Sequence, residues 1–457
     1  MHRTALTVVC ASILLTGTAL ASGFGLREVS ASGFGASYAG GAAPGGSATT
    51  MFFNPALVTD VHSFEIASSA QGLLPDATGD FTATTAAGTP ASGPGQIKDI
   101  VNTAMLPSLA MRARVLDNVA VGLQVTVPWG MVTDYGPDWV GRYYATQSDV
   151  KTANITATVG FQPTPEFSIA AGLQVQYIKG RLGKAIDFGT IGAAAPFSLP
   201  VPAVTIPGMR DGSVLLSAQD WGFGYVVGVT WTPNENLSLG LSYRSEIENT
   251  LKGKEVFDLG STPVAALGGA TVGQFIAAHT GWFQDGGAEA GFTTPSSVTF
   301  GLRYKVSEEL TALVGVDWTG WTSFQELRIS AVPNPYSQPD DVTTMDWKSS
   351  WLFSAGVEYK PCKDWILRLG AAYDQTPTTD QFRTPGIPDG SRTWITIGAG
   401  YKLTDHINLD VSYGHLFFDK GKINLSVATP ENHSRGSLMG EVDMSVDILG
   451  AEVSYHL

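Results

Sequence analysis

The sequence predicts an all-β protein: a transmembrane antiparallel β-barrel of about 14 strands with an N-terminal hatch, or plug, inside the lumen. Three observations predict this fold. Apolar and small polar residues alternate along most of the chain. The connections between these segments are alternately short and long along the chain. A glycine-rich amino-terminal stretch carries aromatic residues that a solvated linker would lack.

Residues 1–21 have the pattern of a secretion signal. Arg3 precedes an apolar run over residues 5–15, and Ala19-Leu20-Ala21 matches an A-x-A cleavage site. The run is too short for a membrane anchor. We therefore expect a mature chain that begins at Ser22 and keeps Cys362 as its only cysteine, which excludes an internal disulfide.

The next stretch, residues 22–60, is rich in glycine, alanine and serine and carries little charge. Glycine-rich backbone suits places where another backbone approaches closely or where φ is positive. The apolar residues of this stretch need burial, and they are Phe24, Leu26, Phe34, Tyr38, Met51, Phe52, Phe53 and Leu57. We therefore predict a hatch over residues 22–61 that packs inside a barrel formed by residues 62–457.

Alternation of period two recurs from residue 62 onward, and residues 119–127 show it most clearly. The same pattern recurs over residues 167–177, 221–231, 395–403 and 407–413. Short turns are expected at residues 116–118, 163–166, 233–236, 307–309, 361–364 and 404–406. Long links are expected at residues 75–100, 129–150, 179–217, 254–292, 322–346, 375–391 and 418–436. Short turns at one rim and long loops at the other are typical of the periplasmic and extracellular sides of an outer-membrane barrel.

A soluble β-sandwich or propeller fits less well. A sandwich leaves charges on its solvated strand faces, whereas only 15% of these residues are charged. Aromatic residues gather near the segment ends, as expected for girdles at the two membrane interfaces. Two long uncharged stretches, residues 188–209 and 259–284, are poor membrane helices because prolines interrupt the first and glycines the second. Thr262-Pro263 predicts a capped loop helix over residues 264–278 instead.

The sequence predicts no catalytic, metal or cofactor site. It has no G-x-S-x-G elbow, no H-E-x-x-H and no zinc spacing of Cys and His. The net charge of −14 argues against a nucleic-acid partner. Asp340-Asp341 is interpreted as solvated surface charge.

At this point the residues resemble a known family. The hatch with its Asn54-Pro55-Ala56-Leu57 ending resembles that of the FadL/TodX family of outer-membrane transporters. Further resemblance lies in Pro128-Trp129-Gly130, Trp139–Tyr143, Gly222-Phe223-Gly224, Leu241–Ser245 and Trp318–Trp321. The resemblance covers nearly the whole mature chain, and it identifies Asn54, Pro55 and Ala56 as the hatch motif.

The resemblance implies passive outer-membrane transport of hydrophobic small molecules, most often long-chain fatty acids. Extracellular loops would capture the cargo, the hatch would shift, and the cargo would leave sideways through the wall near the third strand. Prolines there cannot donate to a ladder, so the candidates for this lateral gap are Pro107, Gly122 and Pro128. A carboxylate head group needs a cation, and the candidates are Lys179, Arg181, Lys184 and Arg244.

Several alternatives stay open at this stage. The cargo is a fatty acid or an aromatic or alkane hydrocarbon. A non-selective pore would show large single-channel conductance, and a barrel lipase or protease would need a Ser/His/Asp trio in its loops. We expect a monomer whose partners are the hydrophobic ligand and the lipid of the outer membrane.

Overall fold

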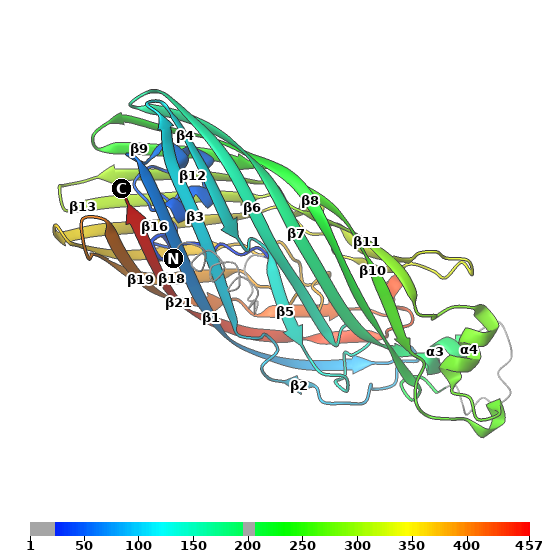
Figure 1. Cartoon of the computed structure of the whole chain (residues 1–457). Coiled ribbons are helices and arrows are strands. Elements are labelled where there is room, and N and C mark those ends of the chain that lie inside the picture. The colour runs from blue at the N-terminus through cyan, green and yellow to red at the C-terminus, as the bar shows by residue number, and fades with distance from the viewer. Residues whose placement is uncertain (1–22, 195–205) are drawn as a thin grey trace, which may run out of the picture.

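The computed structural model describes residues 23–194 and 206–457, and the expected signal over residues 1–21 lies outside them. All strands of the described chain belong to one antiparallel sheet that closes on itself. Figure 1 shows the cylinder lengthwise, with the first strand in blue beside the last strand in red. The prediction of an all-β barrel is confirmed.

Fourteen spans make up the wall. In chain order they are β1 (Phe64–Thr84), β3 (Ala104–Leu116), β4 (Val119–Thr126) continued by β5 (Gly130–Asp134), β6 (Gln147–Thr164), β7 (Phe167–Asp187), β8 (Asp211–Asn234), β9 (Leu237–Arg244) continued by β10 (Ile247–Asp258), β11 (Gly286–Thr294) continued by β12 (Ser297–Lys305), β13 (Leu310–Thr319) continued by β14 (Glu326–Ala331), β15 (Asp341–Thr344) continued by β16 (Ser350–Cys362), β17 (Trp365–Asp374), β18 (Arg392–Lys402), β19 (Ile407–Phe418) continued by β20 (Gly421–Leu425), and β21 (Ser437–His456). The short strand β2 (Gln96–Ile97) pairs with β1.

The first and last spans close the barrel. β1 pairs with β21 from Glu65↔His456 to Thr84↔Ser437, which leaves neither strand with an open edge. In lipid an unpaired edge would leave backbone groups without hydrogen bonds, so closure is required. On β7 the alternation predicted from sequence is clear, because Ile169 and Leu173 are exposed on the outer wall while Gln174 and Gln176 are buried on the lumen side.

Helices are short and few in the described chain. They are α2 (Ala31–Phe34), α3 (Phe188–Ala194) and α4 (Val272–Thr280), with 3₁₀ turns η2 (Ala48–Phe52), η3 (Pro55–Thr59), η5 (Ala265–Leu267), η6 (Trp321–Ser323) and η7 (Pro430–Asn432). None of the helices in these ranges is long and apolar enough to span a bilayer. Figure 1 shows α3 and α4 together at the end of the barrel that carries the long loops.

The amino-terminal segment lies inside the barrel. Its turns α2, η2 and η3 contact strands on several sides of the wall, and its apolar residues Phe34, Leu57 and Val58 are fully buried. Wall glycines make room for it. A Cβ on Gly240 of β9 would lie 1.8 Å from the carbonyl oxygen of Ala42, and a Cβ on Gly370 of β17 would lie 2.2 Å from the carbonyl carbon of Ala36.

Two expectations about loops were wrong. β1 and β7 continue well past residues 75 and 179, where long links were expected, and β8 begins at Asp211, before the expected end of its link at residue 217. The predicted helix over residues 264–278 is divided, because Gly268 and Gly269 adopt positive φ after η5. The true cap is Thr271, whose hydroxyl accepts from the Gln274 amide while the Gln274 side chain accepts from the Thr271 amide.

Candidate functional site

A cavity opens at the long-loop end of the barrel, and we call it the mouth cavity. It has a volume of about 1280 Å³, and its walls include the aromatic side chains of Phe257, Trp282 and Phe283. Phe283 contacts Phe188 of α3 and Phe257 of β10 at ring distances of 5.1 and 5.8 Å. Apolar side chains therefore border the entrance to the lumen.

A second cavity, the inner cavity, follows on the lumen side and has a volume of about 1200 Å³ when the space open to solvent is counted. Most of its walls are apolar and come from spans around the barrel. The apolar lining comprises Met131, Val150, Ile178, Leu182, Val214, Leu216, Leu251, Phe292, Phe324, Leu327, Ile329, Met345 and Ile387. A cavity with this lining suits an apolar ligand.

A charged cluster lies where the two cavities meet, since Lys184, Glu255, Asp341 and Arg435 line both of them. Asp341 accepts from Lys184 at 2.5 Å and from Arg435 at 2.6 Å. Burial opposes ionisation of Asp341 in this extension of the wall, but the charges of Lys184 and Arg435 outweigh it and lower its pKa from 3.8 to about 2. The interpretation of Asp341 as solvated surface was therefore wrong, because the partners that bury it lie far away in sequence.

An aromatic barrier closes the bottom of the inner cavity. Phe24 of the hatch is its centre, and the ring lies 4.7 Å from Trp321, 5.1 Å from Phe292 and 5.6 Å from Trp347. Phe324 and Trp129 complete the shell around Phe24 at 5.8 and 5.9 Å. Such contacts are worth about 0.5–1.5 kcal/mol a pair beyond the area that they bury. The hatch therefore contributes the residue that separates the inner cavity from the space below.

A third cavity, the gap cavity, lies beyond this barrier and has a volume of about 620 Å³. Its walls include Pro128, Trp129 and Arg244. Arg244 donates to the Phe52 carbonyl at 2.9 Å and to the Gln174 side chain, and its guanidinium lies 4.5 Å from the centre of the Phe52 ring. Among the described residues no carboxylate forms an ion pair with Arg244, so its charge is available to an anionic ligand.

The wall beside the gap cavity is interrupted. The ladder between β3 and β4 ends at Leu109↔Val125, and the next pairing of these two spans is the isolated bridge Val101↔Thr133. Within this interval the third span pairs with the hatch instead. Gly25 bridges to Trp129, and the Leu26 amide donates to the Pro128 carbonyl at 2.8 Å. The described residues thus leave a stretch of wall without ladder hydrogen bonds between the second and third spans.

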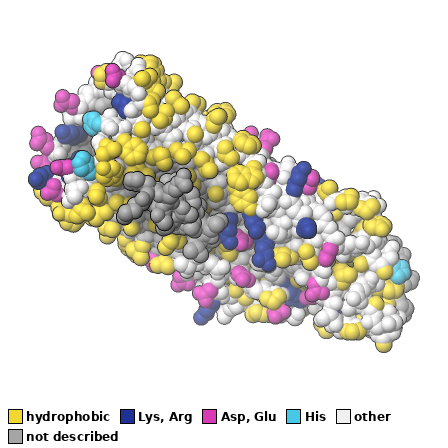
Figure 2. Space-filling view, in the orientation of Figure 1, with side chains coloured by type: hydrophobic (Ala, Val, Ile, Leu, Met, Phe, Trp, Pro, Cys, Tyr) yellow, Lys and Arg dark blue, Asp and Glu magenta, His cyan; other side chains and the backbone are white. Residues whose placement is uncertain are grey.

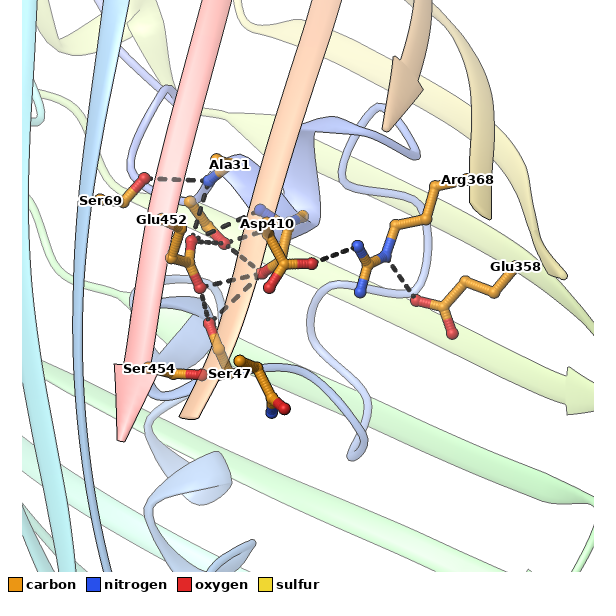
Figure 3. Close-up of polar contacts among 12 residues, drawn as sticks. Ala31, Ser47, Ser69, Glu358, Arg368, Asp410, Glu452 and Ser454 are labelled. Carbon is orange, nitrogen blue, oxygen red and sulfur yellow. Dashed lines mark hydrogen bonds and ion pairs between the residues drawn. The ribbon is translucent and has the colours of Figure 1, made fainter. Parts of the chain in front are cut away.

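One wall carboxylate, that of Glu452 on β21, accepts several hydrogen bonds from the hatch (Figure 3). Glu452 accepts from the Ala31 amide at 2.9 Å, the Ser30 hydroxyl at 3.0 Å and the Ser32 hydroxyl at 3.1 Å. It also accepts from the Ser47 hydroxyl and from the Thr49 hydroxyl at 3.2 Å. Its neighbour Asp410 instead pairs with Arg368 at 2.5 Å, and Arg368 also reaches Glu358.

One further wall residue, Arg112, binds the hatch, and one hatch residue, Asn54, binds the wall. Arg112 of β3 pairs with Glu65 at 2.6 Å and donates to the Leu57 and Gly46 carbonyls at 2.7 and 3.0 Å. Asn54 begins η3 by accepting from the Ala56 amide at 2.9 Å, with Pro55 in the first turn. Its amide group donates to the Ala42 carbonyl at 2.8 Å and to the Val229 carbonyl of β8 at 2.9 Å.

The four cations expected from sequence near a head group lie on different faces of the wall. Lys184 and Arg244 point into the lumen and line cavities. Lys179 and Arg181 are exposed on the outer face, so their assignment as head-group ligands was wrong. They share the parity of the outward-facing Leu173 and Tyr177, and strand alternation directs both away from the lumen.

Two of the three candidates for a lateral gap, Pro107 and Pro128, lie at the interruption, and the third, Gly122, does not. Pro107 pairs with Ala70 of β1 just where β3 loses its β4 partner. Pro128 follows the end of β4 and accepts from the hatch. Gly122 lies lower, within the intact ladder, where a Cβ would lie 2.8 Å from the Val58 side chain of the hatch.

Sequence reasoning did not single out Phe24, Arg435 or Glu452 as functional residues. Their roles depend on contacts between distant segments: Phe24 meets Trp321 and Trp347, and Glu452 meets residues about 400 positions earlier, such as Thr49 at a separation of 403. One signal existed for Glu452, since it is a carboxylate at a lumen-facing position of the apolar last strand. Such a carboxylate needs buried donors.

Comparisons with known proteins agree with this architecture. The family model described as outer membrane protein transport protein (OMPP1/FadL/TodX) matches residues 12–457. The long-chain fatty acid transport protein of Escherichia coli K12 is 25% identical over 96% of this chain and 97% of its own, and outer membrane protein P1 of Haemophilus influenzae is 26% identical over 90% and 89%. A solved FadL homologue from Pseudomonas aeruginosa superposes with a TM-score of 0.84 at 24% identity, covering 95% of this chain and 99% of its own. The toluene transporter TodX of Pseudomonas putida superposes with a TM-score of 0.66 at 17% identity, covering 95% and 99%; at these identities the two structures show the fold alone.

Proposed function

Since the chain belongs to the OMPP1/FadL/TodX family of outer membrane transport proteins, we propose that it carries long-chain fatty acids across the outer membrane without an energy source of its own. The family is one of transport proteins, so this chain is a transporter rather than an enzyme. We also propose that cleavage after Ala21 leaves a hatch over residues 22–61 and a barrel over residues 62–457.

The observation that carries the proposal is the inner cavity. Its lining is mostly apolar and is contributed by spans around the barrel, which suits a hydrophobic cargo. A long acyl chain gains about 0.8 kcal/mol for each buried CH₂ group, so a continuous apolar path would spare it contact with water. The lumen-facing cations Lys184, Arg435 and Arg244 supply charges for its carboxylate.

The proposed path runs through the three cavities in order. The loops capture the acyl chain at the mouth cavity, and the charged cluster of Lys184 and Arg435 receives its head group on the way to the inner cavity. A shift of the hatch then moves Phe24 out of the aromatic barrier and joins the inner cavity to the gap cavity. Arg244 binds the carboxylate there, because no carboxylate of the described chain already neutralises it.

The proposed exit is sideways through the interrupted wall. Pro107 and Pro128 both lie within the stretch in which β3 and the third span share no ladder. Neither proline can donate a backbone hydrogen bond across the gap. Release of Gly25 and Leu26 from Trp129 and Pro128 would leave this stretch open to lipid.

The test is uptake by the Arg244→Gln variant. The variant should bind and take up long-chain fatty acid roughly 10- to 100-fold less well, because a charge-assisted hydrogen bond contributes about 1.5–3 kcal/mol. Uptake of the uncharged methyl ester should not change. Uptake of radiolabelled palmitate and its methyl ester into cells that lack another fatty acid transporter measures both.

The matched control is Arg328→Gln, which removes an exposed arginine paired with Glu326 and Asp340 at the long-loop end. It should transport both compounds like the parent. If uptake of the acid and of the ester fell equally in Arg244→Gln, Arg244 would have no role in binding the head group. If the parent protein took up no fatty acid, the proposed function would be wrong.

Uptake of aromatic hydrocarbons is the second candidate function. The barrier around Phe24 favours it, since five aromatic rings surround this residue within 6 Å. Toluene uptake that exceeds palmitate uptake, and that does not depend on Arg244, would decide for this candidate.

A further inference from the structure

The outer face of the wall carries a group of cations that the transport path does not use. Their side chains are exposed or half-buried and point away from the lumen, and they come from three strands that lie near one another, β6, β7 and β10. We call them the basic surface: Lys151, Lys179, Arg181, Lys252 and Lys254. Figure 2 shows Lys and Arg side chains gathered where the apolar surface of the barrel gives way to mixed surface toward α3 and α4.

The strand pairings place these cations in two rows. In one row Lys151 pairs with Lys179, which pairs with Gln219, which pairs with Lys252. In the next row, toward the long loops, Arg181 and Lys254 flank Ser217. At about 4.8 Å between strands, the first row extends over about 14 Å of the wall and the second over about 10 Å.

The height of the rows follows from the outward residues of β7 and β8. Phe167 pairs with Trp231 at the short-turn end, and Tyr177 pairs with Trp221 ten residues further along β7. Ten residues at about 3.4 Å each, tilted by about 45°, rise roughly 24 Å, which matches the apolar band of an outer-membrane barrel. Lys179 is the next outward residue after Tyr177, so the basic surface begins directly above the aromatic girdle on the long-loop side.

The cations outnumber their partners. Lys151 pairs with Asp149 at 2.8 Å and Lys252 reaches Glu289 at 3.5 Å. Within the described chain no ion pair joins a carboxylate to Lys179, Arg181 or Lys254, although Asp149 is the cross-strand partner of Arg181. Lys151 and Lys179 are direct cross-strand partners, and like charges in that position repel each other unless an anion lies between them.

The surplus of positive charge is confined to this part of the surface, since the chain as a whole carries a net charge of −14. On the seam between β1 and β21 the outward charges of the same half of the barrel are mostly acidic, and they include Asp80 paired with Glu441. General attraction to anions therefore does not explain a basic surface confined to one side.

We propose that the basic surface binds the phosphate groups of lipopolysaccharide, the phosphorylated glycolipid of the outer leaflet. The long loops place this end of the barrel outside the cell. The exposed apolar residues and the Tyr177–Trp221 pair pack against the acyl chains, and the two rows of cations meet the phosphates at the head-group level. Basic side chains fit an anionic head group and lose little hydration there.

The test counts lipid bound to the full-length protein. Protein purified from outer membranes in a non-ionic detergent is titrated with bis-phosphorylated lipid A, and native mass spectrometry measures the bound fraction. The variant Lys179→Gln/Arg181→Gln/Lys254→Gln should bind at least about ten-fold more weakly, because each cation near an anionic lipid surface contributes to attraction. Lipid A without phosphates should bind the parent protein equally weakly. The single variant Lys179→Gln should lie between the parent and the triple variant.

The matched control removes three exposed lysines at the opposite end of the barrel, in Lys305→Gln/Lys360→Gln/Lys363→Gln. This control changes the net charge by the same amount and should bind lipid A like the parent. The proposal would be overturned if Lys179→Gln/Arg181→Gln/Lys254→Gln bound lipid A as tightly as the parent protein. It would also be overturned if the control variant lost as much affinity for lipid A. Equal competition by phosphatidylglycerol would also overturn it, since it would show a general anionic-lipid surface. The change in mobility on heating, read on a gel, checks that every variant is folded.

Discussion

At the scale of single residues, Glu452 illustrates how a buried charge can be stabilised by backbone and hydroxyl donors alone. Its carboxylate is only 4% exposed and forms no ion pair within the described chain. The donors that satisfy it come from the hatch, at Ser30, Ala31, Ser32, Ser47 and Thr49. Since these donors would otherwise lose their partner, Glu452 couples the position of the hatch to the wall.

Glu452→Gln should loosen the hatch. The neutral amide offers one acceptor oxygen where the carboxylate offers two, and charge-assisted hydrogen bonds contribute about 1.5–3 kcal/mol each. We expect amide hydrogen exchange in residues 30–50 to accelerate at least about ten-fold, which corresponds to roughly 1.4 kcal/mol. The control is Glu441→Gln on the same strand, where an exposed carboxylate pairs with Lys420. If amide hydrogen exchange in residues 30–50 were unchanged in Glu452→Gln, the hatch would be held in place without the Glu452 carboxylate.

At the scale of elements, the hatch fits the lumen because the facing strands present glycine. Gly122, Gly240 and Gly370 each lie where a side chain would meet the hatch. Glycine in a strand normally weakens the sheet. Here glycine lowers strand propensity but allows the hatch to approach the wall closely. The barrel is held by a ladder between each pair of neighbouring spans, although the ladder between the second and third spans is interrupted.

Gly240→Ala should displace the hatch while the barrel still forms. The new methyl group would lie 1.8 Å from the Ala42 carbonyl oxygen, which is too close for the two backbones to coexist. We expect ion conductance in planar bilayers and sensitivity of cells to large hydrophilic antibiotics to rise. Gly291→Ala is the matched control, because no atom lies within 4 Å of the place that its new methyl group would take. Parental conductance in Gly240→Ala would mean that the hatch can move aside without opening the lumen.

The sequence predicted the elements best where lipid determines the pattern. Outward apolar residues such as Ile169 and Leu173 reveal the membrane part of β7, but the sheet continues to Asp187 because pairing with β8 persists above the membrane. The same alternation could have shown that Lys179 faces outward, because Lys179 lies an even number of residues after Ile169 and Leu173. The aromatic barrier could not be predicted, because Phe24 and Trp347 meet only once the barrel is closed.

At the scale of the whole molecule, the cavities lie in series and the hatch lies between two of them. The mouth and inner cavities share Lys184 and Arg435, whereas Phe24 and its aromatic shell separate the inner cavity from the gap cavity. The segment that carries Phe24 is also the segment that pairs with the interrupted wall through Gly25. One movement of this segment would therefore open the barrier and the wall together.

A disulfide between hatch and wall tests this coupling. Gly25 and Trp129 form an antiparallel bridge, in which the two Cα atoms lie about 4.5–5.5 Å apart, within the range for a disulfide. In a Cys362→Ser background, oxidised Gly25→Cys/Trp129→Cys should bind palmitate but lose uptake, and a reductant should restore it. The control, Thr250→Cys/Gly291→Cys, joins two outward positions that pair on β10 and β11, away from the hatch. Because it leaves the hatch free, it should transport in both redox states; undiminished uptake by the oxidised hatch variant would show that cargo passes without this movement.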